Sequence, residues 1–251
     1  EEIQMRLSEL CNQFENNVLD ATQAFEHHIN DTNQLAGLPE HAVATAKALA
    51  EEKNQSGWVF NLEFPSYLAI VTYAEDRALR ELFYEAFVTR ASDQGPSAGQ
   101  FDNSKVMQEI LDLRHQKALL LGFKNYAELS IATKMVDKTE EVIEFLLDLS
   151  KRGFDQAREE FAALTAFADS EYGIKELSPW DIAFISEKMR QKFYQLSQED
   201  LRPYFPEPQV MAGLFDIIHR LYGIRLQKEP RAETWHKDVT CYQLIDEEHQ
   251  T

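Results

Sequence analysis

Cysteine is scarce in this sequence, since only Cys11 and Cys241 occur among 251 residues. Neither has a second cysteine at the C-x-x-C spacing, so the sequence gives no support for a dithiol redox centre or a zinc ribbon. Two isolated thiols at opposite ends of the chain fit a reducing compartment better than an oxidising one. We therefore expect a cytoplasmic protein in which Cys11 is a small apolar residue beside Leu10 and Phe14.

Long hydrophobic runs are also missing. Uninterrupted aliphatic runs do not exceed four residues, as in Ala118–Leu121, whereas a membrane-spanning helix needs about 20 apolar residues. The first ten residues, EEIQMRLSEL, begin with two acids where the start of a secretory signal would be basic. We expect neither a membrane span nor a secretory signal.

Basic residues are few relative to acids. The chain has 25 Lys and Arg against 43 Asp and Glu, a formal net charge of −18. Such a surface repels phosphate backbones and anionic lipids, so we expect no nucleic-acid partner and no membrane-surface partner. The 44% apolar content is ordinary for a globular protein, and 251 residues can bury one large core or two modest ones.

Most of the chain shows the three- and four-residue apolar spacing of amphipathic helices. The pattern predicts one helix over residues 1–30, a second over the alanine-rich stretch 41–53, and a long helix that ends near Tyr172. Asn103 and Asp137 stand where N-cap residues are expected. The predicted core stripe of the long helix consists of Phe154, Ala157, Phe161 and Leu164.

The apolar period changes from the helical value to two in two places. Alternating residues predict a short strand near 58–64, and the residues after Ile224 predict one or two further strands. The fold class is therefore expected to be mainly α. The second change of period suggests a division into a helical region, 1–224, and the beginning of a β segment, 225–251.

The C-terminal third carries strong helix signals. Ser178 is a predicted N-cap, Pro179 suits the first helical position, and Asp181 places an acid near the positive helix end. Trp180 and Asp181 could contact a substrate. We favour a structural interpretation, in which Trp180 packs against neighbouring helices and Asp181 is an acid at the helix start. Likewise, Tyr204 and Phe205 in RPYFPEP are interpreted as a structural wedge and not as a binding site. The residues of this helix predicted to be buried are Trp180, Ile185, Met189 and Phe193.

The histidines do not form a recognisable metal motif. None of the seven belongs to H-E-x-x-H, the spacing that places two imidazoles and a base on one helical face. The spacing D-x-x-H occurs twice, as Asp112–His115 and Asp216–His219. It resembles the Glu-x-x-His ligands of di-metal helical bundles, but ordinary pairs on a helix surface are favoured. No metal ligand is assigned within this sequence.

Groups for nucleophilic catalysis or nucleotide binding are likewise missing. The sequence contains no G-x-S-x-G elbow, and neither cysteine has a local catalytic signature. The run GPSAGQ lacks the lysine of a phosphate-binding loop. From its residues alone the chain is a large helical scaffold to which we assign no catalytic and no cofactor-binding residue.

Several motifs together resemble the zinc oligopeptidases of thimet oligopeptidase and dipeptidyl carboxypeptidase type, most closely the bacterial oligopeptidase A branch. The resemblance covers nearly the whole chain, including FPSY, TRASDQGPSAGQFDNSKVMQEILDLRHQKALLLGFKNYAELSIATKM and ETWHKDVTCYQLIDEE. The residues that carry it in the C-terminal third are Trp180, Asp181, Tyr194, Pro203–Pro206, Gly213, Phe215, Gly223 and Ile224.

This resemblance implies a two-lobed cytosolic metallopeptidase that admits short peptides, with this chain forming an α-helical part of the channel wall. In such an enzyme zinc activates water and a glutamate acts as base. The family's H-E-x-x-H motif and further glutamate ligand match nothing in residues 1–251. The resemblance therefore implies zinc in a full-length parent, none in this chain, and a fragment that is inactive alone.

The ends of the chain support the same expectation of a fragment. No capping residue precedes the first predicted helix, and the last predicted strand lacks a return strand. The missing catalytic lobe would then be a partner, docking on an apolar patch around Trp235, Val239 and Tyr242. Two other interpretations stay open: a non-catalytic helical interaction module and a di-metal carboxylate bundle.

Overall fold

The computed structural model describes residues 1–236 and 238–246, and it confirms a mainly α-helical fold. The chain divides into two compact units, Glu1–Gln195 and Leu196–Thr251. The change from helix to strand that suggested a division at 224/225 lies within the second unit.

In the first unit the elements are α1 (Glu2–Ala24), β1 (Glu26–Ile29), the 3₁₀ helix η1 (Thr32–Leu35), α2 (Glu40–Glu52), β2 (Trp58–Asn61), α3 (Phe64–Tyr73), α4 (Arg77–Val88), α5 (Ser104–Leu120), α6 (Tyr126–Ile131), α7 (Thr139–Tyr172) and α8 (Pro179–Tyr194). In the second they are α9 (Gln198–Leu201), η2 (Arg202–Tyr204), α10 (Glu207–Tyr222), β3 (Ile224–Lys228) and β4 (Tyr242–Asp246).

The first predicted helix is shorter than expected. It ends at Ala24 instead of continuing to residue 30, and residues 26–29 form β1. β1 pairs antiparallel with β2, with His27 opposite Phe60. A four-residue strand is too short to show its own period, and its partner lies far along the sequence. The predicted strand near 58–64 is confirmed as β2, but it stops at Asn61 because α3 begins at Phe64.

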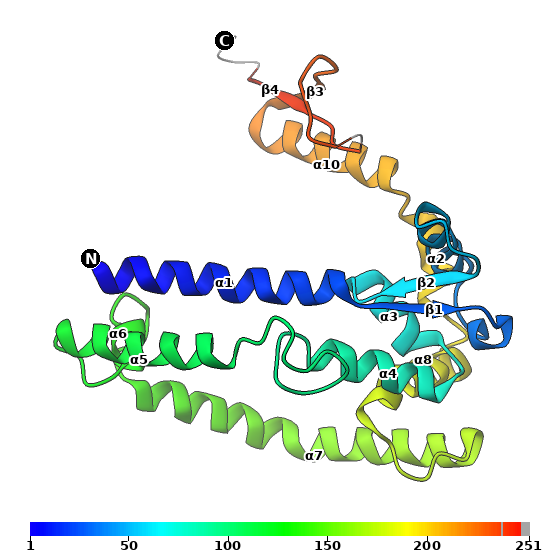
Figure 1. Ribbon diagram of the computed structural model, residues 1–251, viewed down its shortest axis with the longest axis horizontal. Helices are drawn as coiled ribbons and strands as arrows, with labels where there is room; N and C mark the ends of the chain where they lie inside the picture. Colours follow the sequence, from blue (N-terminus) through cyan, green and yellow to red (C-terminus); the bar gives the residue numbers. More distant parts are fainter. Residues whose placement is uncertain (237, 247–251) are drawn as a thin grey trace. The chain divides into compact units, whose positions relative to one another are not determined.

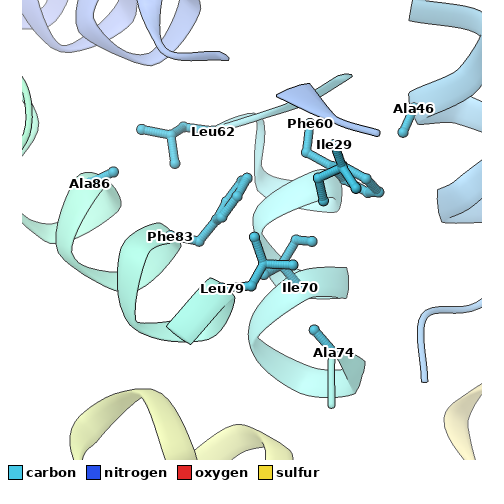
Figure 2. Packing of buried hydrophobic residues seen from close by; sticks show 9 residues of the cluster. All are labelled: Ile29, Ala46, Phe60, Leu62, Ile70, Ala74, Leu79, Phe83 and Ala86. Carbon is cyan, nitrogen blue, oxygen red and sulfur yellow. The ribbon is translucent and has the colours of Figure 1, made fainter. Parts of the chain in front are cut away.

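The main core of the first unit lies where the two-stranded β1–β2 sheet meets α2, α3 and α4 (Figure 2). Phe83 is at its centre, fully buried, with its ring edge-on to Phe25, His27 and Phe60. The buried members of this cluster are Ile29, Ala46, Phe60, Leu62, Ile70, Ala74, Leu79, Phe83 and Ala86.

A second cluster joins α1 to α5, which lie side by side (Figure 1). Asn103 precedes α5, as predicted, but its side chain does not cap the helix. It is 2% exposed and bonds to α1 instead: its amide donates to the Phe14 carbonyl (3.1 Å) and accepts from Asn17 (2.8 Å). The neighbouring carboxylate of Asp102 accepts from the Ser104 amide (2.9 Å). Asn103 is therefore a polar link between two helices.

Replacing Asn103 with alanine should lower the free energy of unfolding by about 1–3 kcal/mol, because the Asn17 amide and the Phe14 carbonyl would lose a buried partner. Chemical denaturation of the 251-residue chain measures this. Asn16→Ala is a suitable control, since Asn16 is exposed on α1 and alanine has the higher helix propensity. Equal effects of the two substitutions would contradict the role given to Asn103.

The long helix α7 ends at Tyr172 as predicted, but two details of the prediction are wrong. Its N-cap residue is Lys138 rather than Asp137, and no side chain caps it. The expected core stripe is largely on the surface: Phe154 is 61% exposed and Phe161 53%. α7 packs on α6 and α8 near its two ends, so its middle turns have no apolar cover within the described residues.

The second unit is built from one long helix and one hairpin. α10 packs on β3, and β3 pairs antiparallel with β4, placing Leu226 opposite Leu244. Gly223 ends α10 with a positive φ of 67°, which lets the chain turn directly into β3. The predicted strands after Ile224 are thus confirmed. No helix in the described part of the chain is both long and apolar enough to cross a membrane.

Candidate functional site

In the two histidine–aspartate pairs singled out in the sequence, each aspartate interacts with another residue of its own helix, and the buried Nδ1 of His219 has no hydrogen-bond partner among the described residues. Asp112 accepts a hydrogen bond from Gln108 (3.0 Å), and Asp216 forms an ion pair with Arg220 (2.8 Å). Across residues 1–236 and 238–246, no three His, Cys, Asp or Glu side chains gather in a way that could hold a metal ion. The described residues therefore do not fit a catalytic zinc site, and we derive no reaction step through a metal held by them.

Asp181 is instead the centre of a buried ion cluster. Its carboxylate is fully buried and accepts from Arg77 (Nη2, 2.7 Å) and from Arg80 (Nη2, 2.9 Å). The same carboxylate accepts from the Ser178 amide (3.0 Å), which forms the capping box of α8. One side chain therefore starts α8 and joins it to α4.

Arg80 is the most deeply buried cation of this cluster. Its side chain is 1% exposed, and its guanidinium lies over the Phe184 ring, 4.0 Å from the centroid. It also donates to the carbonyls of Ala74 (2.7 Å) and Glu75 (3.2 Å). Burial lowers the pKa of Arg80, against the opposing effect of its hydrogen bond to Asp181. Removal of Asp181 would leave this charge buried without its anion.

The pKa of Asp181 is lowered overall. Burial alone would raise it, but hydrogen bonds from Arg77, from the Ser178 backbone and from Arg80 favour the ionised carboxylate and outweigh burial. The carboxylate is thus held as an anion among donors. The cluster presents neither a nucleophile nor a general base, so its chemistry is structural.

The other residues predicted from the C-terminal third have mixed outcomes. Trp180 is half-buried, its ring 6.0 Å from that of Tyr84, and its indole nitrogen has no hydrogen-bond partner among the described residues. Ile185 is fully buried, as predicted, and Met189 packs against the α7–α8 cluster. The prediction for Phe193 is wrong, because this ring is 62% exposed even though it lies 6.0 Å from the Phe167 ring of α7.

The aromatic residues of the second unit lie largely on its surface. Tyr204 and Phe205 are 73% and 69% exposed, so they do not act as a wedge within the described residues. At the predicted apolar patch, Trp235 is 86% exposed, Val239 is half-buried, and Tyr242 makes an edge contact with Phe215 on α10 (5.1 Å between centroids). These exposed rings mark a surface rather than a catalytic centre.

Comparison with known proteins gives the context of these features. The model of peptidase family M3 matches residues 70–251. The chain belongs to this family. It is 52% identical to oligopeptidase A of Salmonella typhimurium over 249 residues, which are 99% of this chain and 37% of that protein.

More distant members of family M3 align over almost the same length. The probable cytosolic oligopeptidase A of Arabidopsis thaliana is 38% identical over 97% of this chain and 35% of its own length. Dipeptidyl carboxypeptidase of Escherichia coli is 30% identical over 94% of this chain and 34% of its own length. The chain thus spans little more than a third of the length of these curated relatives. It corresponds to one segment of an M3 peptidase.

Proposed function

We propose that this chain is a structural segment of a zinc-dependent oligopeptidase that hydrolyses short peptides in the cytoplasm. The observation that carries the proposal is the 52% identity to oligopeptidase A across 99% of the chain. At that identity the segment contributes the same structural part to its protein as the matching region does to oligopeptidase A. The two unpaired thiols agree with a reducing compartment.

In this proposal the segment's role is architectural. Its helices form part of the wall of a substrate channel that admits short, unfolded peptides and excludes folded proteins by size. The buried Asp181 cluster supports this role because its ion pairs with Arg77 and Arg80 hold α8 against α4 within the first unit. Catalytic zinc, which would activate the attacking water, would be held by residues outside 1–251. No metal-binding group among the described residues competes with that assignment.

The proposal predicts activity in a longer protein containing this segment and none in residues 1–251 alone. A catalytic zinc site needs about three protein ligands and an open position for water, and the described residues offer no such group. Both proteins should be assayed with short quenched-fluorescent peptides and, separately, with a folded protein as substrate. The longer protein should cleave only the peptides, lose activity to a chelator and regain it with zinc.

Two outcomes would overturn the proposal. Chelator-sensitive turnover by residues 1–251 at a rate near that of the longer protein would place the catalytic ligands within this segment. A longer protein that folds but leaves every peptide intact would remove the peptidase assignment. Iron or manganese bound stoichiometrically to residues 1–251 would favour a di-metal carboxylate bundle instead.

A further inference from the structure

Helix α10 of the second unit is apolar on two sides, but only one of them is covered. The covered side faces the β3–β4 hairpin, where the Phe215 ring meets Tyr242. The half-buried apolar residues of this side are Met211, Phe215 and Ile218. A helix that is apolar well beyond one stripe is typical of an element buried between two layers, and here the second layer is missing.

The uncovered side carries a regular row of aliphatic side chains, which we call the open stripe. It consists of Val210, Leu214, Ile217 and Leu221, which are 48%, 45%, 55% and 68% exposed. Their spacing of four, three and four residues places all four on one narrow face of α10. A row at this spacing is the pattern by which a helix packs against another apolar element, because side chains three and four residues apart form one continuous ridge.

The second unit also has too little core to be complete. Among its described residues, none of the hydrophobic side chains is buried. Its strands β3 and β4 pair only with each other in the described chain, so each has an unpaired edge. A two-stranded hairpin is marginally stable in water unless further strands or a helix pack on it. Here α10 packs on β3, but this contact leaves no hydrophobic side chain of the described unit fully buried. The unit therefore requires an apolar layer from elsewhere.

Gly213 gives an independent sign of close packing beside the open stripe. It lies inside α10, next to Leu214, where glycine weakens a helix relative to alanine. A Cβ added at this position would meet nothing within 4 Å, so no contact in the described chain requires glycine there. Close approach of another backbone is a physical reason for glycine at such a site.

We infer that an apolar element from the part of the M3 protein outside residues 1–251 packs on the open stripe. This inference rests on the proposed function, because it requires the segment to belong to a longer peptidase. The chain covers only 37% of the length of oligopeptidase A of Salmonella typhimurium, so a protein of that length has ample further chain to provide the missing layer. A tethered segment also has a far higher effective concentration at the stripe than a second copy of the protein.

Photo-cross-linking in the longer protein tests which element covers the stripe. A benzophenone amino acid placed at Leu214 should give intramolecular cross-links to peptides outside residues 1–251, identified by mass spectrometry. The matched control is the same probe at Ala212, which is exposed on another side of α10 and should give at most one-tenth of that yield. Cross-links from position 214 to residues within 1–251, cross-links between two copies, or none at all would each overturn the inference.

A substitution in the same longer protein gives a second, independent test. Leu214→Asp places a charge where we infer a dry interface, so the folding equilibrium constant should fall at least about 100-fold, as for a charge buried without a partner. Ala212→Asp should change it less than about threefold. Equal effects of the two variants would overturn the inference. Neither readout needs peptidase activity, so a longer protein without turnover would refute the proposed function and leave this test intact.

Discussion

Replacing Asp181 with asparagine should lower the free energy of unfolding of the chain by about 3–5 kcal/mol, the usual cost of removing one partner from a buried ion pair. Asparagine preserves the size of the side chain but removes the charge that compensates Arg80, whose side chain is 1% exposed. It also weakens the acceptor for Arg77 and for the Ser178 amide. Urea denaturation near neutral pH, followed by circular dichroism, measures the loss.

The pH dependence of stability should change in the same variant. The pKa of Asp181 in the folded chain is lowered, below the value of about 3.9 for an unfolded aspartate. The stabilisation is therefore fully present above the unfolded pKa and is lost as the pH falls through the folded pKa. The stability difference between the original chain and Asp181→Asn should accordingly be constant near neutrality and shrink in acid below about pH 4.

Asp148→Asn provides the matched control. Asp148 also pairs with an arginine, Arg152 (2.8 Å), but its side chain is 53% exposed, and exposed pairs contribute about 0–1 kcal/mol. If both variants lost the same stability, burial of the Asp181 cluster would not be the cause. A stability difference for Asp181→Asn that grew in acid would contradict the direction of its pKa shift.

The Asp181 cluster shows what sequence reasoning can and cannot reach. Ser178, Pro179 and Asp181 lie within four residues of one another, so the start of α8 could be predicted from local spacing and is confirmed. Arg77 and Arg80 lie 104 and 101 residues from Asp181. No local pattern identifies them as its partners. The one signal in the sequence was a pair of arginines three residues apart, which places them on the same side of a helix.

Periodicity predicted which helix faces are apolar but not what covers them. The apolar stripe of α7 was correctly recognised as apolar, yet Phe154 and Phe161 are exposed because α6 and α8, the main neighbours of that helix in the described chain, do not cover these two rings. The same reason applies to the open stripe of α10. The residues that cover a stripe lie far along the sequence or outside it, whereas the stripe itself is set by the spacing of apolar residues within about three consecutive helical turns.

β1 was missed for a related reason. Its four residues, Glu26–Ile29, follow a helix whose apolar spacing runs almost to their start, and they become a strand by pairing with β2. A long-range pairing of this kind outweighs local propensity. The pairing also creates the main core, because it places Ile29 and Phe60 beside Phe83 (Figure 2).

Phe83→Ala should be among the most destabilising single changes in this core, at about 3–5 kcal/mol. The Phe83 side chain is fully buried, and three rings meet it edge-on: Phe25 at 5.5 Å, His27 at 5.9 Å and Phe60 at 6.5 Å between centroids. Truncation removes these contacts and leaves a cavity where α4 meets the β1–β2 sheet. The neighbouring buried side chains, Phe60 among them, are fixed on their own strands and helices, so the surroundings can fill the cavity only in part.

The measurement is urea denaturation of the 251-residue chain, with Phe154→Ala as the matched control. Phe154 has the same side chain on a helix but is 61% exposed, so its truncation should cost less than about 1 kcal/mol. Hydrogen exchange should also speed up in β1 and β2, because the Phe83 ring of α4 contacts a residue of each strand, His27 and Phe60. Equal losses for the two phenylalanines, or unchanged exchange in β1 and β2 of the Phe83→Ala variant, would show that the core is not organised around this side chain.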